Sequence, residues 1–253
     1  MIKNLYRTAA VCAISVGMAL AAALPAGASS GPRLTSHEQA AYAASGARFR
    51  FAETTFTLPD ATRFASEVSG LGVSVQLISS ENTWMVLSFN TTTASGVYSA
   101  SYANEFNAGQ SIGSNGTLGP NGWAKAGDSV TLSIYYDRAG HDQLVAVDNT
   151  TNEAHFATVA IPTTNYTQAR VGTEFGDTPS STAPYTAPAD VTHLVGLTGI
   201  RLTSYSGHHA GLVSWWERQQ VFMVNDNVIQ VEPHDVFAAG TSFEVYMEPL
   251  PHN

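Results

Sequence analysis

The feature that most constrains this chain is a period-two alternation of apolar and polar residues, which recurs along most of its length. Between Val130 and Tyr136, for example, apolar side chains at every second position are separated by single hydroxyl-bearing residues. Every second side chain of a strand points to the same face, so each such stretch predicts a strand with one buried face. Comparable stretches lie at 49–51, 73–77, 84–89, 144–147, 156–161, 169–175, 194–202, 221–224 and 243–247.

Clusters of Gly, Asn, Ser and Pro separate these stretches, and helical periodicity is nearly absent. Many short strands divided by turn signals predict an all-β fold, and one polar face per strand is typical of antiparallel sheets. We therefore expect an antiparallel two-sheet β-sandwich. Residues 31–44 are interpreted as a partly helical lead-in, and 107–122 and 178–190 as long loops.

The N-terminus has the pattern of a secretory signal peptide. Lys3 and Arg7 precede an apolar run from Ala9 to Leu24, and Ala26-Gly27-Ala28 then offers a small-residue cleavage site. The run is shorter than a membrane span, and no stop-transfer segment follows it. We predict a signal peptide at residues 1–28, a single domain at 29–253, secretion, and no membrane association.

Charge and cysteine content narrow the function classes further. All 20 Asp and Glu residues lie after the signal, which removes two of the 11 basic residues, so the mature net charge is 9 − 20 = −11 with His neutral. Such a chain is a poor partner for nucleic acid or an anionic membrane. Cys12, the sole cysteine, leaves with the signal, so the mature chain has no disulfide or thiolate site.

Two short motifs carry little functional weight. Gly109-Gln-Ser-Ile-Gly113 matches a hydrolase nucleophile elbow, but that motif requires a strand–turn–helix setting, which this β-rich chain does not offer. His208-His209 has no third ligand at metal-binding spacing. We predict neither a metal nor a cofactor, and the sequence does not indicate an oligomeric state.

One carboxylate stands out within the strand predicted at 169–175. Ala169, Val171, Thr173 and Phe175 alternate with Gln168, Arg170, Gly172 and Glu174, so Glu174 lies on the polar face. Arg170 shares that face, about 13 Å away along the strand. Glu174 is therefore a candidate acid–base group, and Arg170 a candidate ligand-binding residue.

The order of several segments resembles that of the glutamic peptidases, or eqolisins. These segments are Tyr42-Ala-Ala-Ser-Gly-Ala-Arg-Phe49 with Phe56-Thr-Leu-Pro59, Tyr98-Ser-Ala-Ser-Tyr102, Ala126-Gly-Asp-Ser-Val-Thr-Leu-Ser-Ile134, Val147-Asp-Asn-Thr-Thr-Asn152 and Ala169-Arg-Val-Gly-Thr-Glu174. The resemblance implies a concanavalin-like sandwich and acid proteolysis. In that family a Glu acts as general base on a water, and a Gln amide holds the water and stabilises the oxyanion.

The resemblance places Glu174 at the catalytic Glu, but other family positions are changed. Ser88 falls at the position of the Gln, and Ser99 and Ala103 replace acidic residues. Gln76 is a second candidate for the amide, because it alternates with Val75 and Leu77 and so lies on a polar strand face, one strand away from the family position.

Three functions remain open from the sequence. The leading hypothesis is a non-catalytic or feebly active relative with a degraded dyad, which binds an extended peptide or polysaccharide. The alternative is an acid endopeptidase with Glu174 as base and Gln76 or Ser88 as oxyanion donor. The third is a lectin-like module with Trp215 or Trp216 as its platform, which Tyr185 and Tyr205 would extend.

Overall fold

The computed structural model describes most of the chain after residue 33. The described ranges are 34–36, 39–64, 70–81, 83–106, 110–111, 115–161, 165–176, 193–212, 217–225, 228–234 and 240–247. The signal peptide predicted at residues 1–28 lies outside them. The described residues form strands and one short 3-10 turn, Ala61–Phe64. None of their helices is long and apolar enough to cross a membrane.

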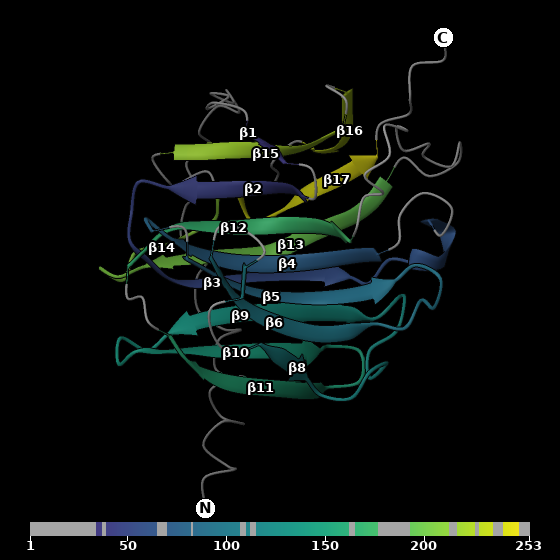
Figure 1. Cartoon of the computed structure of the whole chain (residues 1–253), viewed down its shortest axis with the longest axis horizontal. Coiled ribbons are helices and arrows are strands. Elements are labelled where there is room, and N and C mark those ends of the chain that lie inside the picture. The colour runs from purple at the N-terminus through teal and green to yellow at the C-terminus, as the bar shows by residue number, and fades with distance from the viewer. Residues whose placement is uncertain are drawn as a thin grey trace, which may run out of the picture.

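The strands form two facing layers (Figure 1). The front layer is antiparallel, and its central strand pair is β12 with β4. Two short strands, β7 and β8, pair with β6 at one edge. In order across the sheet, the front strands are β6 (Ser99–Phe106), β5 (Thr83–Thr92), β4 (Gly70–Ser79), β12 (Tyr166–Gly176), β2 (Gln39–Ser45) and β15 (Glu217–Asn225), with β7 at Gln110–Ser111 and β8 at Gly116–Leu118.

The back layer continues from β15, which pairs with β2 along its first part and with β16 at its end. The two layers are thus joined along one edge. Among the described residues, every pairing is antiparallel except that of β1 (Leu34–Ser36) with β15. The remaining back strands, in order, are β16 (Val228–Pro233), β17 (Phe243–Met247), β13 (His193–Ser204), β3 (Phe49–Thr57), β9 (Ser129–Tyr136), β10 (His141–Asp148) and β11 (Glu153–Ala160), with β14 (His209–Ala210) beside β13.

The core lies between the two layers, as the alternation predicts. Strand β9 alternates buried and half-buried side chains over its whole length, with Val130, Leu132 and Ile134 fully buried. Aromatic rings from the two layers meet edge to face in this core, for example Phe56 and Phe89 at 6.4 Å between centroids. The all-β, two-sheet prediction is confirmed.

The lead-in at 31–44 differs from its predicted helical character, because residues 39–45 form β2 in the middle of the sheet. Ala40, Tyr42 and Ala44 enter the main core, whereas Ala41 and Ala43 are buried on the other face beside a valine of β15. Since both faces are buried, the segment shows no polar alternation, and its alanines gave no strand signal.

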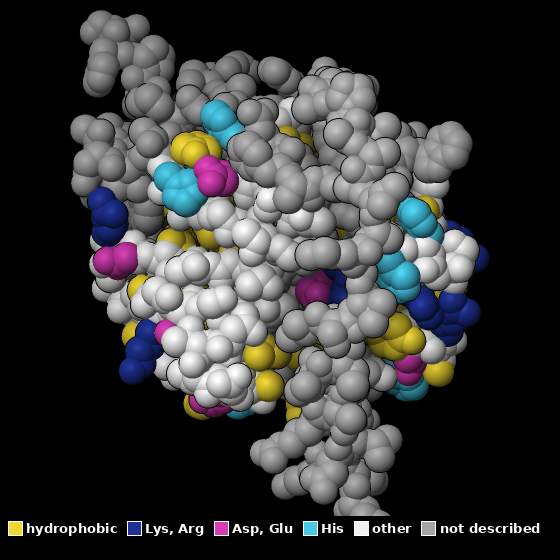
Figure 2. Space-filling model, turned by 180° about the vertical axis from the view of Figure 1, so that it is seen from behind, with side chains coloured by type: hydrophobic (Ala, Val, Ile, Leu, Met, Phe, Trp, Pro, Cys, Tyr) yellow, Lys and Arg dark blue, Asp and Glu magenta, His cyan; other side chains and the backbone are white. Residues whose placement is uncertain are grey.

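The outer face of the back layer is mostly neither charged nor apolar (Figure 2). Hydroxyl groups bond across its strands, as between Thr55 Oγ1 and Thr131 Oγ1 at 2.7 Å. Glu53 and Arg201 form a partly exposed ion pair there, at 3.1 Å between Oε1 and Nη2. The described polar groups of this face thus bond to one another across the strands.

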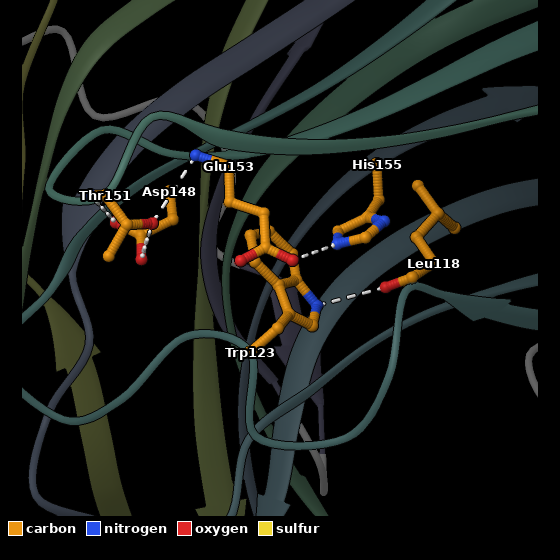
Figure 3. Close-up of polar contacts among 6 residues, drawn as sticks. All are labelled: Leu118, Trp123, Asp148, Thr151, Glu153 and His155. Atoms are coloured by element: carbon orange, nitrogen blue, oxygen red, sulfur yellow. Dashed lines mark hydrogen bonds and ion pairs between the residues drawn. The ribbon is translucent and has the colours of Figure 1, made fainter.

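A Trp–His contact ties the segment after β8 to strand β11 (Figure 3). Trp123 Nε1 donates to the Leu118 carbonyl at 3.1 Å, and the His155 ring packs on the indole at 4.6 Å between centroids. His155 Nε2 also lies 2.8 Å from Glu153 Oε1. This titratable cluster is accounted for by packing and lies in the other layer from Glu174.

Candidate functional site

Strand β12 presents Glu174 on the face of the front layer that points away from the core. Ala169, Val171 and Phe175 are buried in the core, and Thr173 donates its hydroxyl to the Ala40 carbonyl at 3.2 Å. Glu174 is half-buried on the opposite face. The sequence-based placement of Glu174 on the polar face therefore agrees with the structure.

The structure brings Gln76 directly against Glu174. Gln76 Nε2 donates to Glu174 Oε1 at 2.6 Å, and it also donates to Ser74 Oγ at 3.2 Å. An ionised carboxylate only accepts hydrogen bonds, so the amide nitrogen, rather than its oxygen, must face Glu174. Gln76 is only 1% exposed, so this amide lies buried beside the carboxylate.

The register explains how the two side chains meet. Gln76 lies opposite Arg170 across the β4–β12 pair, whereas Glu174 lies opposite Gly72. The two positions are four residue pairs apart along the sheet, so both side chains must extend toward each other. Between them on this face of β4 lie Ser74 and Gly72, whose side chains are short.

Ser88 is placed differently from its predicted position at the dyad amide. It lies on β5 opposite Ser74, so that strand β4 separates it from β12. Ser88 is 3% exposed, and its Oγ accepts from Asn90 Nδ2 at 3.0 Å. The same Asn90 amide bonds to Ser101 Oγ at 3.0 Å. Ser88 thus belongs to a neutral hydroxyl–amide network one strand further from Glu174, and the amide that contacts Glu174 is that of Gln76.

Arg170 approaches Glu174 through an intervening amide that the sequence analysis missed. Arg170 Nη1 donates to Gln39 Oε1 at 2.7 Å, and Gln39 Nε2 lies 3.4 Å from Glu174 Oε1. Gln39 reaches this position because β2 pairs with β12 and places Gln39 opposite Glu174. No sequence signal marked Gln39, since its segment did not show a strand pattern.

Arg170 is itself a buried cation, with 9% of its surface exposed. Its guanidinium lies 4.8 Å from the centre of the Trp84 ring, and Nη2 donates to Gln168 Oε1 at 3.1 Å. Burial lowers the pKa of Arg170 to about 10, and the nearby charge of Glu174 opposes that shift. Arg170 therefore stays protonated at acidic and neutral pH.

The other predicted binding residues lie outside the described part of the chain or away from Glu174. Trp215, Trp216 and Tyr185 lie outside the described residues. Tyr205 packs against Tyr136, and the guanidinium of Arg138 lies over its ring. Its pKa is raised to about 12, chiefly by desolvation. Tyr205 thus fills a structural position at the end of β13.

Metal ligation has no support within the described ranges. There, no group of three or more His, Cys, Asp or Glu side chains lies close enough together to hold a metal ion. His209 Nδ1 instead lies 2.8 Å from the hydroxyl of Thr203.

Comparisons with known proteins agree with the fold. No family model matches the sequence, and no curated protein matches it. Solved structures do match. Scytalidoglutamic peptidase bound to a transition-state-analogue inhibitor has a TM-score of 0.61 at 16% identity, covering 84% of this chain and 98% of that one.

Two further solved structures agree. SCP-B, an eqolisin in complex with the tripeptide Ala-Ile-His, has a TM-score of 0.56 at 16% identity, covering 84% of this chain and 98% of that one. Aspergilloglutamic peptidase from Aspergillus niger has a TM-score of 0.52 at 15% identity, covering 71% of this chain and 99% of that one. The chain thus has the concanavalin-like β-sandwich fold of the glutamic peptidases.

Proposed function

We propose that this protein is a secreted acid endopeptidase in which Glu174 is the general base and Gln76 is the oxyanion donor. The observation that carries the proposal is the 2.6 Å contact between Gln76 Nε2 and Glu174 Oε1. It pairs a carboxylate that can move a proton with a neutral amide that can stabilise developing negative charge. This pairing favours the catalytic alternative over a degraded dyad.

The chemistry would proceed by attack of water on the scissile carbonyl. Glu174 takes one proton from the water as its oxygen bonds to the carbonyl carbon. The C=O electron pair moves onto the oxygen, which the Gln76 amide stabilises. When the tetrahedral species collapses, the C–N bond breaks and Glu174 returns its proton to the leaving amine. No other reactant is needed.

The direct contact between the two side chains represents a resting arrangement. At 2.6 Å there is no room for a water between Gln76 Nε2 and Glu174 Oε1, so one of the two side chains must rotate to admit it. Gln76 keeps its second bond, to Ser74 Oγ at 3.2 Å, during such a movement. That anchor would hold the amide near the position of the developing oxyanion.

An extended peptide is the substrate class that the surroundings favour. The side chains next to the dyad on this face are short, with Gly72 and Ser74 on β4 and Gly172 on β12. The solved scytalidoglutamic peptidase structure holds a peptide-based transition-state analogue, and SCP-B holds a tripeptide. A polysaccharide ligand has no comparable support among the described residues.

The test is cleavage of a denatured protein by residues 29–253, followed from strongly acidic to neutral pH. We expect acid cleavage that Glu174→Gln abolishes, because the amide cannot accept the proton. Gln76→Ala should lower kcat by about 10²- to 10³-fold, the usual effect of losing one oxyanion donor. Glu53→Gln, on the back layer, is the matched carboxyl control and should keep full activity.

Two results would redirect the proposal. If peptide binds but is not cut at any pH, the chain is a binding protein with a degraded dyad. If Ser88→Ala abolishes cleavage while Gln76→Ala does not, the oxyanion donor is Ser88. Both outcomes contradict the roles assigned to Glu174 and Gln76.

A further inference from the structure

We propose that Arg170 and Gln39 are positioning residues that orient the Glu174 carboxylate and hold it ionised under acidic conditions. The inference rests on the proposed role of Glu174 as general base, and it deepens that role. It assigns Arg170, a candidate ligand-binding residue from the sequence, to the carboxylate instead of to the substrate.

The orientation of the Gln39 amide follows from its two neighbours. Arg170 can only donate hydrogen bonds, so the group that accepts from it at 2.7 Å must be the Gln39 oxygen. The Gln39 nitrogen is then turned toward Glu174 Oε1, at 3.4 Å. The arginine thus decides which end of the Gln39 amide meets the carboxylate.

Glu174 Oε1 therefore faces amide nitrogens from two flanking strands. Gln76 approaches it from β4 and Gln39 from β2, while β12 lies between these two strands. If Gln76 rotates to admit a water, Gln39 still holds the carboxylate in place. Glu174 can then present its base to the water without losing its orientation.

The burial of Arg170 indicates that its charge acts on Glu174. Its described hydrogen bonds go to neutral side-chain oxygens, Gln39 Oε1 and Gln168 Oε1, and its Nε is buried without a bond. A guanidinium that is 9% exposed needs compensation by opposite charge, and Glu174 is the carboxylate that interacts with it. The attraction is mutual, so it favours the ionised form of Glu174.

On the described strands that contact β12, no second charged side chain lies on the same face as Glu174 and Arg170. Strand β4 carries no titratable residue, and Tyr42 of β2 points into the core. On the back-layer strands that touch β12, Arg50 of β3 stacks on the ring of a β9 tyrosine, and the remaining charged groups are the Glu53–Arg201 pair and the half-exposed His193 of β13. Among the described side chains of β12, β4 and β2, Arg170 is thus the cation on the Glu174 face.

The experiment measures two quantities in the full mature chain. One is the acid limb of the pH profile of kcat/KM. The other is the NMR titration midpoint of the Glu174 side-chain carboxyl, which can be read whether or not the protein cleaves peptide. The variants are Arg170→Gln, Arg170→Lys and Gln39→Leu, and Arg201→Gln on the back layer is the control for loss of one arginine.

We expect Arg170→Gln to raise the pH of the acid limb of kcat/KM and the Glu174 titration midpoint, each by roughly half to one unit. This is less than the shift of about 1–3 pKa units that a cation in direct contact typically causes. Arg170→Lys keeps the charge and should restore most of the shift. Gln39→Leu should lower kcat/KM by about tenfold, as for the loss of one bond to a charged group. Arg201→Gln should leave the midpoint unchanged.

An unchanged Glu174 midpoint in folded Arg170→Gln overturns the inference, as does an equal shift in Arg201→Gln. If Arg170→Gln does not fold, Gln39→Leu decides, and an unaltered rate and midpoint in that variant would overturn it. A wild-type protein that cleaves nothing refutes the proposed function instead. The Glu174 titration still tests the positioning role in that case, so the two failures are distinguishable.

Discussion

Replacing Asp142 by Asn is expected to flatten the pH dependence of the free energy of unfolding between acidic and neutral pH. Asp142 lies on β10, is 0% exposed, and points into the core between the layers. Tyr166 donates its hydroxyl to Asp142 Oδ2 at 2.5 Å, while Oδ1 is buried without a hydrogen bond. Asp142 is thus a carboxyl in an apolar site.

The pKa of Asp142 is raised from 3.8 to about 7, chiefly by burial, although the Tyr166 bond acts in the opposite direction. A raised carboxyl pKa means that the folded protein binds a proton that the unfolded chain has already released. The contribution of Asp142 to stability is therefore present below pH 3.8 and lost progressively as the pH rises to about 7. At 1.36 kcal/mol per unit, the shift corresponds to at most about 4 kcal/mol.

The assay is urea unfolding of the mature chain at a series of pH values from below 4 to about 8, a window set by the Asp142 shift. Asp142→Asn keeps the shape of the side chain and an acceptor for the Tyr166 hydroxyl, but it cannot ionise. We expect wild type to lose about 2–4 kcal/mol relative to this variant as the pH rises through that window. Other carboxyls titrate equally in both proteins and cancel.

Glu81→Gln, at an exposed position, is the control for removing one carboxyl from the chain. It should reproduce the wild-type pH profile of stability. If Asp142→Asn shows the same loss of stability with rising pH as wild type, then Asp142 does not carry a proton in the folded state. The assignment of a buried neutral acid would then be refuted.

Two glycine substitutions test close approaches in the sheet. Gly172→Ala should lower the free energy of unfolding by about 1–3 kcal/mol, because its Cβ would lie 2.3 Å from the Cβ of an alanine on β2. Gly196→Ala is its control in thermal unfolding and should be nearly neutral, since its Cβ would meet nothing closer than 4.0 Å. Gly119→Ala would place its Cβ 2.5 Å from the His155 ring, so in urea it should destabilise the fold more than Gly127→Ala, which shares the positive φ but has open space.

The fold class could be predicted from the sequence because a strand with one polar face shows a clear alternation of apolar and polar residues. Strand β9 is such a case, with hydroxyl residues between buried aliphatic ones. Strand β2 is the opposite case, since both of its faces are buried and alanine favours no strand face. The sequence therefore missed the strand that carries Gln39, and with it one amide of the site.

From the sequence, the amide partner of Glu174 could be predicted to lie on a polar strand face, but the strand that carries it could not be predicted. Alternation placed Gln76 on a polar face and the family resemblance placed Ser88 at the amide position, and nothing local to either residue shows which strand pairs with β12. That choice is made by long-range pairing, which puts β4 next to β12 and β5 beyond it. Gln76 and Glu174 also meet diagonally across the β4–β12 pair, four residue pairs apart, beside the small residues Ser74 and Gly72.

Two half-buried or buried carboxyls in this protein have opposite requirements at acidic pH. Asp142 stabilises the fold when it is protonated, because its site is apolar and its described polar contact is the Tyr166 hydroxyl. Glu174 must stay ionised to act as a base, and we propose that it does so because Arg170 and two amides surround it. A single acidic environment can therefore favour both the folded state and the working form of the dyad, with the neighbours of each carboxyl setting its protonation.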